Sequence, residues 1–520
     1  MQLTQPLHQG RLEKPDATAL VCGPHRSSFA ELIDRVARLA AVLRAQGLQP
    51  GDRVAMLGHN SDHYIVFFYA VWWAGGAINP VNMRWSAREI AYSLDDCDTR
   101  ILLVDENFHR TVAGLRSLST SLRCLMHWGN GPAPVGGDLL DGPQLAAQAQ
   151  PVADAARGGH DLAAVMYTGG TTGRPKGVML THANLVHNIL AANQAATRPV
   201  DAVGISIAPM FHVGGMGLVL QLMQRLCRQI ILPAFDELAL LHAIADERGS
   251  ETFLVPTMLK RLVEHPRFAE FDTTALQLVL YGAAPIDESL LALAQRSLPA
   301  AGFCQLYGMT ELSPVVTALP AWCHAPGKPP GRLRSAGRAV AVAEVRIVDP
   351  HGQPVASGVV GEIVARGPCV MAGYWNQPEQ TAAAVQDGWT HTGDVGWMDG
   401  DGFVYVVDRL KDMIVTGGEN VYSAEVENAI ALLPAVSMVA AIGVPDDRWR
   451  ARVHAVVVVL RDGLVLDAEA LIAHCRQQIA GHKCPRSVEF RSALPLSAAG
   501  NLLKHELRAP FWAGRSRAVN

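Results

Sequence analysis

The chain has 520 residues, roughly three times the length of a typical single domain, so two to four domains are expected. Hydrophobic residues make up 49% and charged residues 18% of the sequence, a balance that excludes small disulfide-rich, collagen-like and disordered proteins. The 44 basic and 48 acidic side chains give a formal net charge of −4, so the sequence offers no general electrostatic footprint for nucleic acid.

The N-terminal region lacks the charged start and apolar core of a secretory signal, so we expect a cytoplasmic protein. The nine cysteines are scattered and never spaced as Cys-x-x-Cys, which argues against a disulfide framework and a zinc ribbon. The most apolar run, Tyr64 to Ile78, is shorter than the roughly 20 residues that span a bilayer. It follows Asn60 and Ser61, which are typical helix-capping residues, and we predict that it forms a buried helix.

The first four hundred residues alternate short β-branched runs with amphipathic segments. Val54 to Leu57 and Ile101 to Val104 are predicted strands, and Ser28 to Gln46 is a predicted helix. This alternation is typical of βα units around largely parallel sheets, so the predicted fold class is α/β.

The pattern of residue types changes after Gly393. The predicted elements there are a strand over Phe403 to Val407, a charged link from Asp408 to Asp412, apolar runs at Val436 to Val444 and Val453 to Leu460, and a helix near Asp467 to Ile479. These elements suggest a compact α+β unit of ordinary domain size. We therefore predict a large N-terminal domain over residues 1–410 and a small C-terminal domain over 411–520, with a hinge near Lys411.

A glycine- and threonine-rich loop follows a predicted strand at Ala163 to Tyr167. The loop reads Thr168-Gly169-Gly170-Thr171-Thr172-Gly173-Arg174-Pro175-Lys176-Gly177. Glycines let successive backbone N–H groups point into one concavity, and hydroxyls and a lysine add donors and charge, so the segment suits a polyphosphate. It is not a Walker A loop, because no Gly-Lys-Ser/Thr stands at the required spacing. The alternative is a glycine-rich surface turn. A helix capped by Thr181 is predicted to follow.

Further motifs follow this loop in order. They are Pro209-Met210-Phe211-His212-Val213-Gly214-Gly215, Val255-Pro256-Thr257-Met258, Tyr281-Gly282-Ala283-Ala284-Pro285, Gln305-Leu306-Tyr307-Gly308-Met309-Thr310-Glu311, Thr392-Gly393-Asp394, and Asp408-Arg409-Leu410-Lys411-Asp412 running on to Gly417-Gly418-Glu419-Asn420. Over most of its length the chain thus resembles the adenylate-forming superfamily of acyl-CoA synthetases, firefly luciferase and peptide-synthetase adenylation domains. The resemblance is closest to fatty-acyl or aryl-acid CoA ligases.

The resemblance implies a two-step ligase that uses ATP, Mg²⁺ and coenzyme A. A fatty or aryl carboxylate attacks the α-phosphate of ATP to give acyl-AMP and pyrophosphate, and the CoA thiol then attacks the acyl carbon and releases AMP. It also implies a large domain of βα-layered sheets with a β-barrel-like subdomain, and a small mobile C-terminal domain that acts as a lid. A long-chain substrate would add a peripheral membrane contact.

The resemblance also implies a role for each matched residue. Thr168, Gly169, Gly170, Thr171, Thr172, Gly173 and Lys176 would hold the ATP phosphates, with Thr310 as a donor to the α-phosphate and Glu311 as the ligand of Mg²⁺. Gly282, Ala283, Ala284 and Tyr307 would frame the adenine, and Asp394 and Arg409 would bind the ribose. Gly417 and Gly418 would line the pantetheine path, Trp449 and Arg486 would touch the CoA nucleotide, and His212 would gate the acyl pocket.

Structural alternatives stand beside these roles. Glu311 would also serve as a helix cap, Asp394 as an ordinary turn aspartate, Tyr307 as a half-buried aromatic and His212 as a core histidine. The sequence holds no metal-ligand constellation and no Gly-x-Ser-x-Gly hydrolase motif, which disfavours covalent acyl-enzyme chemistry.

One position departs from the superfamily pattern. Relatives carry a Gly-Lys pair in the C-terminal lobe, and its lysine bridges carboxylate and ATP during adenylation, whereas this chain has Asn501 there. An amide carries no charge, and loss of a charged transition-state contact costs about 10²- to 10³-fold in rate. Lys504, three residues on, is a candidate substitute or a solvated helix lysine. The alternatives are therefore an acid–CoA ligase, a ligase that loads a carrier protein, and an adenylation-impaired homologue.

Overall fold

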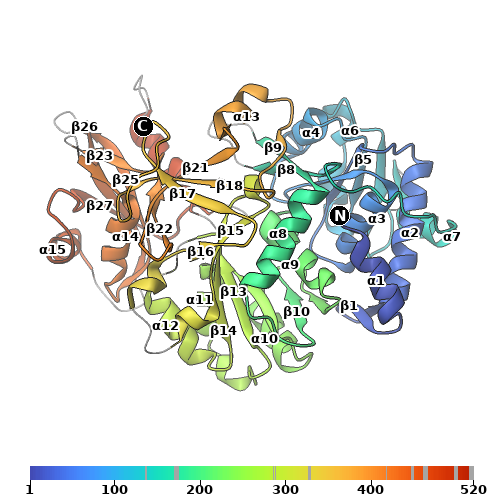
Figure 1. Cartoon of the computed structure of the whole chain (residues 1–520), viewed down its shortest axis with the longest axis horizontal. Coiled ribbons are helices and arrows are strands. Elements are labelled where there is room, and N and C mark those ends of the chain that lie inside the picture. Colours follow the sequence, from blue (N-terminus) through green and yellow to red (C-terminus); the bar gives the residue numbers. More distant parts are fainter. Residues whose placement is uncertain are drawn as a thin grey trace.

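The computed structural model describes residues 1–134, 138–168, 175–284, 286, 288–325, 330–416, 419–446, 450–460, 466–496 and 502–513. These residues form a large N-terminal domain of sheets and helices and a small C-terminal domain. In Figure 1 the N-terminal elements, coloured blue, lie on the right, and the orange and red C-terminal elements lie on the left. The predicted α/β class with a small α+β domain is confirmed.

The first sheet is mostly parallel, with antiparallel strands at both ends. Its strands, in spatial order, are β16 (Arg338–Ala339), β15 (Val315–Leu319), β14 (Gly302–Gly308), β13 (Leu278–Gly282), β12 (Glu251–Leu254), β10 (Val203–Ser206), β11 (Arg228–Ile231), β1 (Thr18–Cys22) and β2 (His25–Ser28). Its helices include α10 (Glu237–Ala245), α11 (Pro256–Val263) and α12 (Glu288–Ser297).

The second sheet has a parallel body, from β8 through β4, β3, β5 and β6 to β7, and an antiparallel edge, β9 and β19. Its strands, in spatial order, are β19 (Gly373–Tyr374), β9 (Lys176–Thr181), β8 (Leu162–Thr168), β4 (Ala77–Pro80), β3 (Arg53–Leu57), β5 (Ile101–Val104), β6 (Cys124–His127) and β7 (Leu139–Asp141). The accompanying helices are α1 (Gln5–Glu13), α2 (Phe29–Ala45), α3 (Asp62–Ala74), α4 (Ala87–Asp96), α5 (His109–Val112), α6 (Leu115–Leu118) and α7 (Gly142–Gln148).

Two helices, α8 (His182–Ala195) and α9 (Val213–Gln224), lie between the large sheets (Figure 1). Apolar side chains of both helices belong to the core of the second sheet and also to the core beneath the first. Thr181 caps α8 as predicted, because its hydroxyl accepts from the Asn184 backbone N–H, and Asn184 bonds back to the Thr181 N–H. The predicted loop and this helix are separated by strand β9, which the sequence analysis did not anticipate.

A third, antiparallel sheet connects the large sheets to the small domain. Its strands are β17 (Glu344–Val348), β18 (Gly361–Arg366), β20 (Val385–Gln386), β21 (Trp389–Met398) and β22 (Val404–Arg409), with helix α13 (Pro378–Ala384) beside it. All the described pairings of this sheet are antiparallel. Strand β22 pairs with β21 and leads directly into the C-terminal elements.

The small domain contains a hairpin, a sheet and three helices among the described residues. These are β23 (Ile414–Thr416) with β24 (Glu419–Val421), the sheet of β25 (Val436–Asp446), β26 (Arg450–Leu460) and β27 (Ser487–Arg491), and the helices α14 (Ser423–Ala431), α15 (Ala468–Gln478) and α16 (Lys504–Trp512). The predicted apolar runs and the predicted helix correspond to β25, β26 and α15.

The apolar run that we predicted as one buried helix ends earlier than expected. Helix α3 is buried along its whole length and begins after Ser61, whose hydroxyl accepts from the Tyr64 backbone N–H. It stops at Gly75, which adopts a left-handed φ of 95°, and Ile78 belongs to strand β4. In the described part of the chain, no helix is long and apolar enough to cross a membrane.

Candidate active site

A cleft of about 300 Å³ lies where the first and third sheets meet the small domain. It is lined by the residues predicted for adenine and ribose, namely Gly282, Ala283, Ala284, Tyr307, Asp394 and Arg409. Leu502 and Lys504 line it from the small domain. The chain therefore brings residues more than two hundred positions apart to one cleft.

Asp394 occupies the centre of a small polar network in this cleft. The Tyr307 hydroxyl donates to Asp394 Oδ2 over 2.8 Å, and Arg409 Nε lies 3.3 Å from Asp394 Oδ1. Burial raises the pKa of the Asp394 carboxyl, although Arg409 and Tyr307 partly offset the rise. The arrangement holds an oriented carboxylate toward the cleft, as binding of a sugar hydroxyl requires.

The turn before Asp394 explains how its carboxylate is aimed. Gly393 has a left-handed φ of 69°, a conformation that glycine adopts without steric cost. The Glu362 carboxylate accepts from the Gly393 backbone N–H over 3.0 Å, and Thr392 Oγ1 accepts from the Asp394 N–H over 3.1 Å. Glu362 also pairs with the His391 ring over 2.8 Å.

The Gly282-Ala283-Ala284 turn is close-packed at its start and strained in its middle. A Cβ on Gly282 would lie 2.1 Å from the Leu306 carbonyl oxygen, so only glycine fits there. Ala283 has a φ of 65°, in the region that residues with a side chain rarely enter. Small side chains thus leave one wall of the cleft open to a flat ligand.

Glu311 and Lys176 approach each other around Tyr374, a residue that the sequence analysis missed. The Tyr374 hydroxyl donates to Glu311 Oε1 over 2.8 Å, and Lys176 Nζ lies 4.8 Å from the centre of the Tyr374 ring. Burial raises the pKa of the Glu311 carboxyl, and Tyr374 and Lys176 oppose that rise. Thr310 opens the short 3-10 turn Thr310–Leu312 that carries Glu311.

Thr168 and Lys176 face each other across the β8–β9 ladder. They flank the predicted phosphate loop, whose Gly169, Gly170, Thr171, Thr172 and Gly173 lie outside the described residues. The predicted loop is therefore flanked by two hydrogen-bonded strands. Both a phosphate-binding loop and an ordinary turn are compatible with this geometry.

His212 stands immediately before α9 and is packed against Phe211, with ring centres 4.4 Å apart. Its Nε2 is buried and has no hydrogen-bond partner among the described residues. Burial lowers the pKa of the His212 imidazole to about 4, and the charge of Arg84 acts in the same direction. His212 is therefore neutral at physiological pH, and its unpaired nitrogen distinguishes it from a hydrogen-bonded core histidine.

The residues predicted for CoA and for the adenylation contact are largely outside the described part of the chain. Gly417, Gly418, Trp449 and Asn501 all fall there. Arg486 is described and exposed, just before β27, where its backbone N–H donates to the Val453 carbonyl, and it does not line the cleft.

Lys504 is held within the small domain although it lines the cleft. Its ammonium lies 2.7 Å from Glu427 Oε1 and donates to Ser423 Oγ over 2.5 Å. The Ser423 hydroxyl in turn donates to Asp408, which also accepts from the Ser423 N–H. Burial alone would lower the pKa of the Lys504 ammonium, but Glu427 and Asp408 outweigh it and raise that pKa.

Sequence reasoning missed Tyr374, Glu362, Glu427 and Ser423. Each acts on a residue far away in the chain, and none belongs to a pattern with a chemical signature of its own. Only their partners stood inside a motif: the acceptors Glu311 and Asp408, and the donor Gly393.

Comparison with known proteins shows the family of this chain. The model of the AMP-binding enzyme matches residues 8–375, and that of the AMP-binding enzyme C-terminal domain matches residues 425–501. The chain belongs to the AMP-binding enzyme family. The resemblance to the adenylate-forming superfamily is thereby confirmed, as is the predicted enzyme class, an AMP-forming ligase of the acyl-CoA synthetase group.

Two feruloyl-CoA synthases, from Amycolatopsis and Streptomyces species, are 41% identical to this AMP-binding enzyme over 97% of its length and 98% of theirs. A fatty acid–acyl-carrier-protein ligase from Streptomyces coeruleorubidus is 33% identical over 98% of this chain and 96% of its own. The ATP-bound structure of MatB from Rhodopseudomonas palustris is 32% identical, with a TM-score of 0.89 over 98% of this chain and 99% of that one.

The buried imidazole of His212 predicts a measurable effect of pH on stability. Its pKa is about 4 in the folded protein and near 6.5 in the unfolded chain, so the unfolded state binds the extra proton as the pH falls. This group should therefore remove about 2 kcal/mol of unfolding free energy between pH 7 and pH 5. Urea titrations of the wild type and of His212→Asn across this range should show a shallower acid decline in the variant. Parallel declines would contradict the assignment.

Proposed function

We propose that this enzyme is an ATP-dependent acid–CoA ligase that activates an aryl carboxylic acid. The carrying observation is the single cleft in which Tyr307, Asp394 and Arg409 of the large domain meet Leu502 and Lys504 of the small domain. A cytoplasmic location, which nine cysteines without a disulfide favour, is part of the proposal.

In the proposed first step, a carboxylate oxygen of the acid attacks the α-phosphorus of ATP and pyrophosphate leaves. Asp394 and Arg409 would hold the ribose, and the Gly282–Ala284 wall would hold the adenine, fixing the nucleotide in the cleft. Lys176 and Thr310 would offset charge that builds on the transferring phosphoryl group, since positioning and electrostatics dominate such transfers.

The residues present fit a magnesium ion bound with the nucleotide. Mg²⁺ is usually held by one or two carboxylates together with substrate phosphates, and it would neutralise phosphate charge during transfer. Glu311 is a buried carboxylate whose Oε1 is fixed by a neutral donor, Tyr374, which adds no positive charge of its own. The described residues contain no cluster of three or more His, Cys, Asp or Glu side chains able to hold a metal, so one carboxylate with phosphates is the arrangement proposed.

The substrate proposal rests on the similarity to feruloyl-CoA synthases and on one glycine beside His212. A Cβ on Gly214 would lie 3.5 Å from the Phe253 ring, so the position has room for little more than a methyl group. Gly215, by contrast, is required by packing, because a Cβ there would lie 2.2 Å from the Pro209 carbonyl oxygen. The Ser313 hydroxyl donates to the Cys369 carbonyl and does not offer itself to a substrate. A leucine at position 214 would therefore press on the Phe253 ring, whereas an alanine would not.

A panel of carboxylic acids read by AMP release tests this function. We expect ferulate and related arylpropenoic acids to exceed straight-chain fatty acids at least tenfold in kcat/KM, as a difference of about 1.4 kcal/mol in transition-state binding requires. Gly214→Leu should abolish this preference by filling the space beside Phe253, whereas Gly214→Ala should retain it.

The acceptor is decided in the same assay by comparing CoA with a holo carrier protein. Thioester formation with CoA supports the proposal, and transfer to the carrier alone would favour the carrier-loading alternative. Robust activity only with fatty acids would overturn the aryl assignment and leave the ligase chemistry standing.

We propose that the residue at position 501 affects only adenylation, the first half-reaction. Its neighbour Leu502 lines the cleft and forms a β-bridge with Leu496, which joins the described residues on either side of 497–501. Lys504 is ion-paired with Glu427, which supports the view that its charge is not free to replace a lysine at 501.

We predict that Asn501→Lys raises ATP–pyrophosphate exchange by one to three orders of magnitude, the scale of one charged transition-state contact. Conversion of a supplied acyl-adenylate to thioester should change little. Lys504→Met serves as the comparison. If it abolishes exchange while Asn501→Lys does nothing, Lys504 already compensates; no exchange in any of the three proteins, with acids across the panel, would favour the adenylation-impaired alternative.

We further propose that the domains, divided at residues 410 and 411, reorient about Lys411 between the two steps. The Lys411 carbonyl accepts from Arg508 over 2.7 Å, and Asp412 pairs with Arg508 over 2.9 Å, so α16 holds both positions. Lys411→Pro fixes φ near −65° and should reduce thioester formation much more than adenylation. Equal loss of both half-reactions would count against the hinge.

A further inference from the structure

The two chain segments that flank residues 169–174 both contact helix α4. The Tyr167 hydroxyl, at the end of β8, donates to Asp96 Oδ2 over 2.7 Å, and the Tyr92 hydroxyl donates to the Pro175 carbonyl over 3.4 Å. The Tyr92 and Tyr167 rings also meet edge to face, with centres 6.4 Å apart. Helix α4 thus contacts both the end of β8 and the residue before β9.

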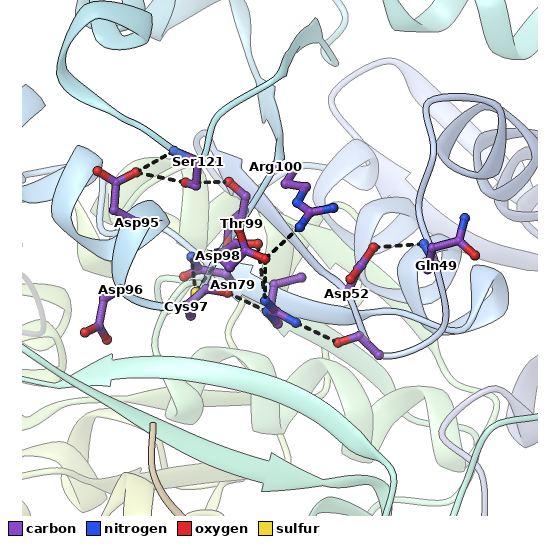
Figure 2. A network of polar contacts seen from close by, with 12 residues as sticks. Gln49, Asp52, Asn79, Asp95, Asp96, Cys97, Asp98, Thr99, Arg100 and Ser121 are labelled. Atoms are coloured by element: carbon purple, nitrogen blue, oxygen red, sulfur yellow. Dashed lines mark hydrogen bonds and ion pairs between the residues drawn. The ribbon is translucent and has the colours of Figure 1, made fainter. Parts of the chain in front are cut away.

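The α4 end of these contacts is itself firmly held. Asp95 accepts from backbone or hydroxyl groups of Ser119, Thr120 and Ser121. The Asp96 side chain points away from Ser121 (Figure 2). After the helix, Arg53 Nε donates to the Cys97 carbonyl over 2.5 Å. Asp96 is therefore a fixed acceptor rather than a mobile surface carboxylate.

The same end of α4 also contacts the turn that follows β19, the strand paired with β9. The Asn376 side-chain amide donates to the Asp96 carbonyl over 3.3 Å, and the Trp375 backbone N–H donates to the Gly177 carbonyl over 2.7 Å. The Arg53 guanidinium lies 4.7 Å from the centre of the Trp375 ring. Asp96 therefore contacts Tyr167 of β8 through its side chain and Asn376 through its backbone carbonyl. Asn376 lies two residues after Tyr374, the partner of Glu311.

The end of β8 and the start of β9 matter because each carries a residue proposed to bind the ATP phosphates. Thr168 follows Tyr167 directly, and Lys176 follows Pro175 directly, and these two residues pair across the ladder. A shift of about 1 Å in groups that bind a transferring phosphate can cost about 100-fold in rate. The sheet pairs β8 with β4 at Ala164, four residues before Thr168, so the contacts with α4 act on a part of β8 beyond that pairing.

We infer that Asp96 and Tyr167 form a positioning pair that sets Thr168 and Lys176 for the ATP polyphosphate, with Tyr92 as its second contact. The inference rests on the proposed function, since it presumes that these residues face the β- and γ-phosphates. Neither Asp96 nor Tyr92 touches the reacting atoms in this scheme. Their effect is confined to ligands that carry a polyphosphate.

The test compares Tyr167→Phe, Asp96→Asn and the double variant with the wild type. Tyr64→Phe is the matched control, because Tyr64 is fully buried and its hydroxyl has no hydrogen-bond partner among the described residues. We measure ATP–pyrophosphate exchange at varied ATP, thioester formation from supplied acyl-adenylate, and the dissociation constants of ATP and AMP by calorimetry.

We expect each single variant to raise the KM and the Kd for ATP about tenfold, the scale of one hydrogen bond to a charged group. The Kd for AMP and thioester formation from acyl-adenylate should stay within twofold, and the double variant should be no worse than either single one. Tyr64→Phe should match the wild type in every assay.

Equal losses for ATP and AMP, or for both half-reactions, would show a merely structural role and overturn the inference. Unchanged ATP affinity in all variants would overturn it as well, while leaving the proposed function intact if the wild type catalyses exchange. A wild type without exchange across the acid panel would refute the proposed function instead, and the comparison of ATP with AMP affinity would still decide the positioning pair.

Discussion

The pairing of β21 with β22 is the constraint on which the rest of the site depends. Its register sets Asp394 opposite Arg409, and the Leu410 N–H donates to the Gly393 carbonyl over 2.8 Å at the end of the ladder. Asp408, one residue before Arg409, accepts from Ser423 of α14. Because side chains alternate along a strand, a slip of one residue would exchange the places of Arg409, which faces Asp394, and Asp408, which holds the small domain. Ligand binding and domain attachment thus share one register.

Tyrosine hydroxyls recur as the partners of the carboxylates around this site. Tyr307 orients Asp394, Tyr374 orients Glu311, and Tyr167 contacts Asp96. A neutral donor fixes a carboxylate without cancelling its charge, which suits Glu311 as the proposed cation ligand, whereas Asp394 also faces Arg409 and suits a neutral sugar hydroxyl. The buried carboxylates can therefore be held in place and still act on a nucleotide or metal.

The parts that the sequence predicted are those with a local pattern. β-Branched runs and caps predicted β3, β5, α2 and α8, and the resemblance implied one nucleotide site for Tyr307, Asp394 and Arg409, which line the same cleft. Gly75 is a typical helix-ending residue, but our prediction followed the apolar run and continued the helix past it. The partners Tyr374, Glu362 and Asp96 were not predictable, because a single tyrosine or carboxylate far along the chain bears no mark of the residue it will meet. The roles at Asn501 and Gly417 remain predictions.

The Lys504–Glu427 pair restricts how this chain can change over evolutionary time. The two side chains are only 12% and 19% exposed, and they lie 2.7 Å apart at the junction of two domains. Removing one partner of a buried ion pair leaves an uncompensated charge and typically costs about 3 to 5 kcal/mol, whereas an apolar replacement of both is often neutral. Single substitutions at either position are therefore disfavoured while paired ones are tolerated, so descendants should keep both residues or exchange them together.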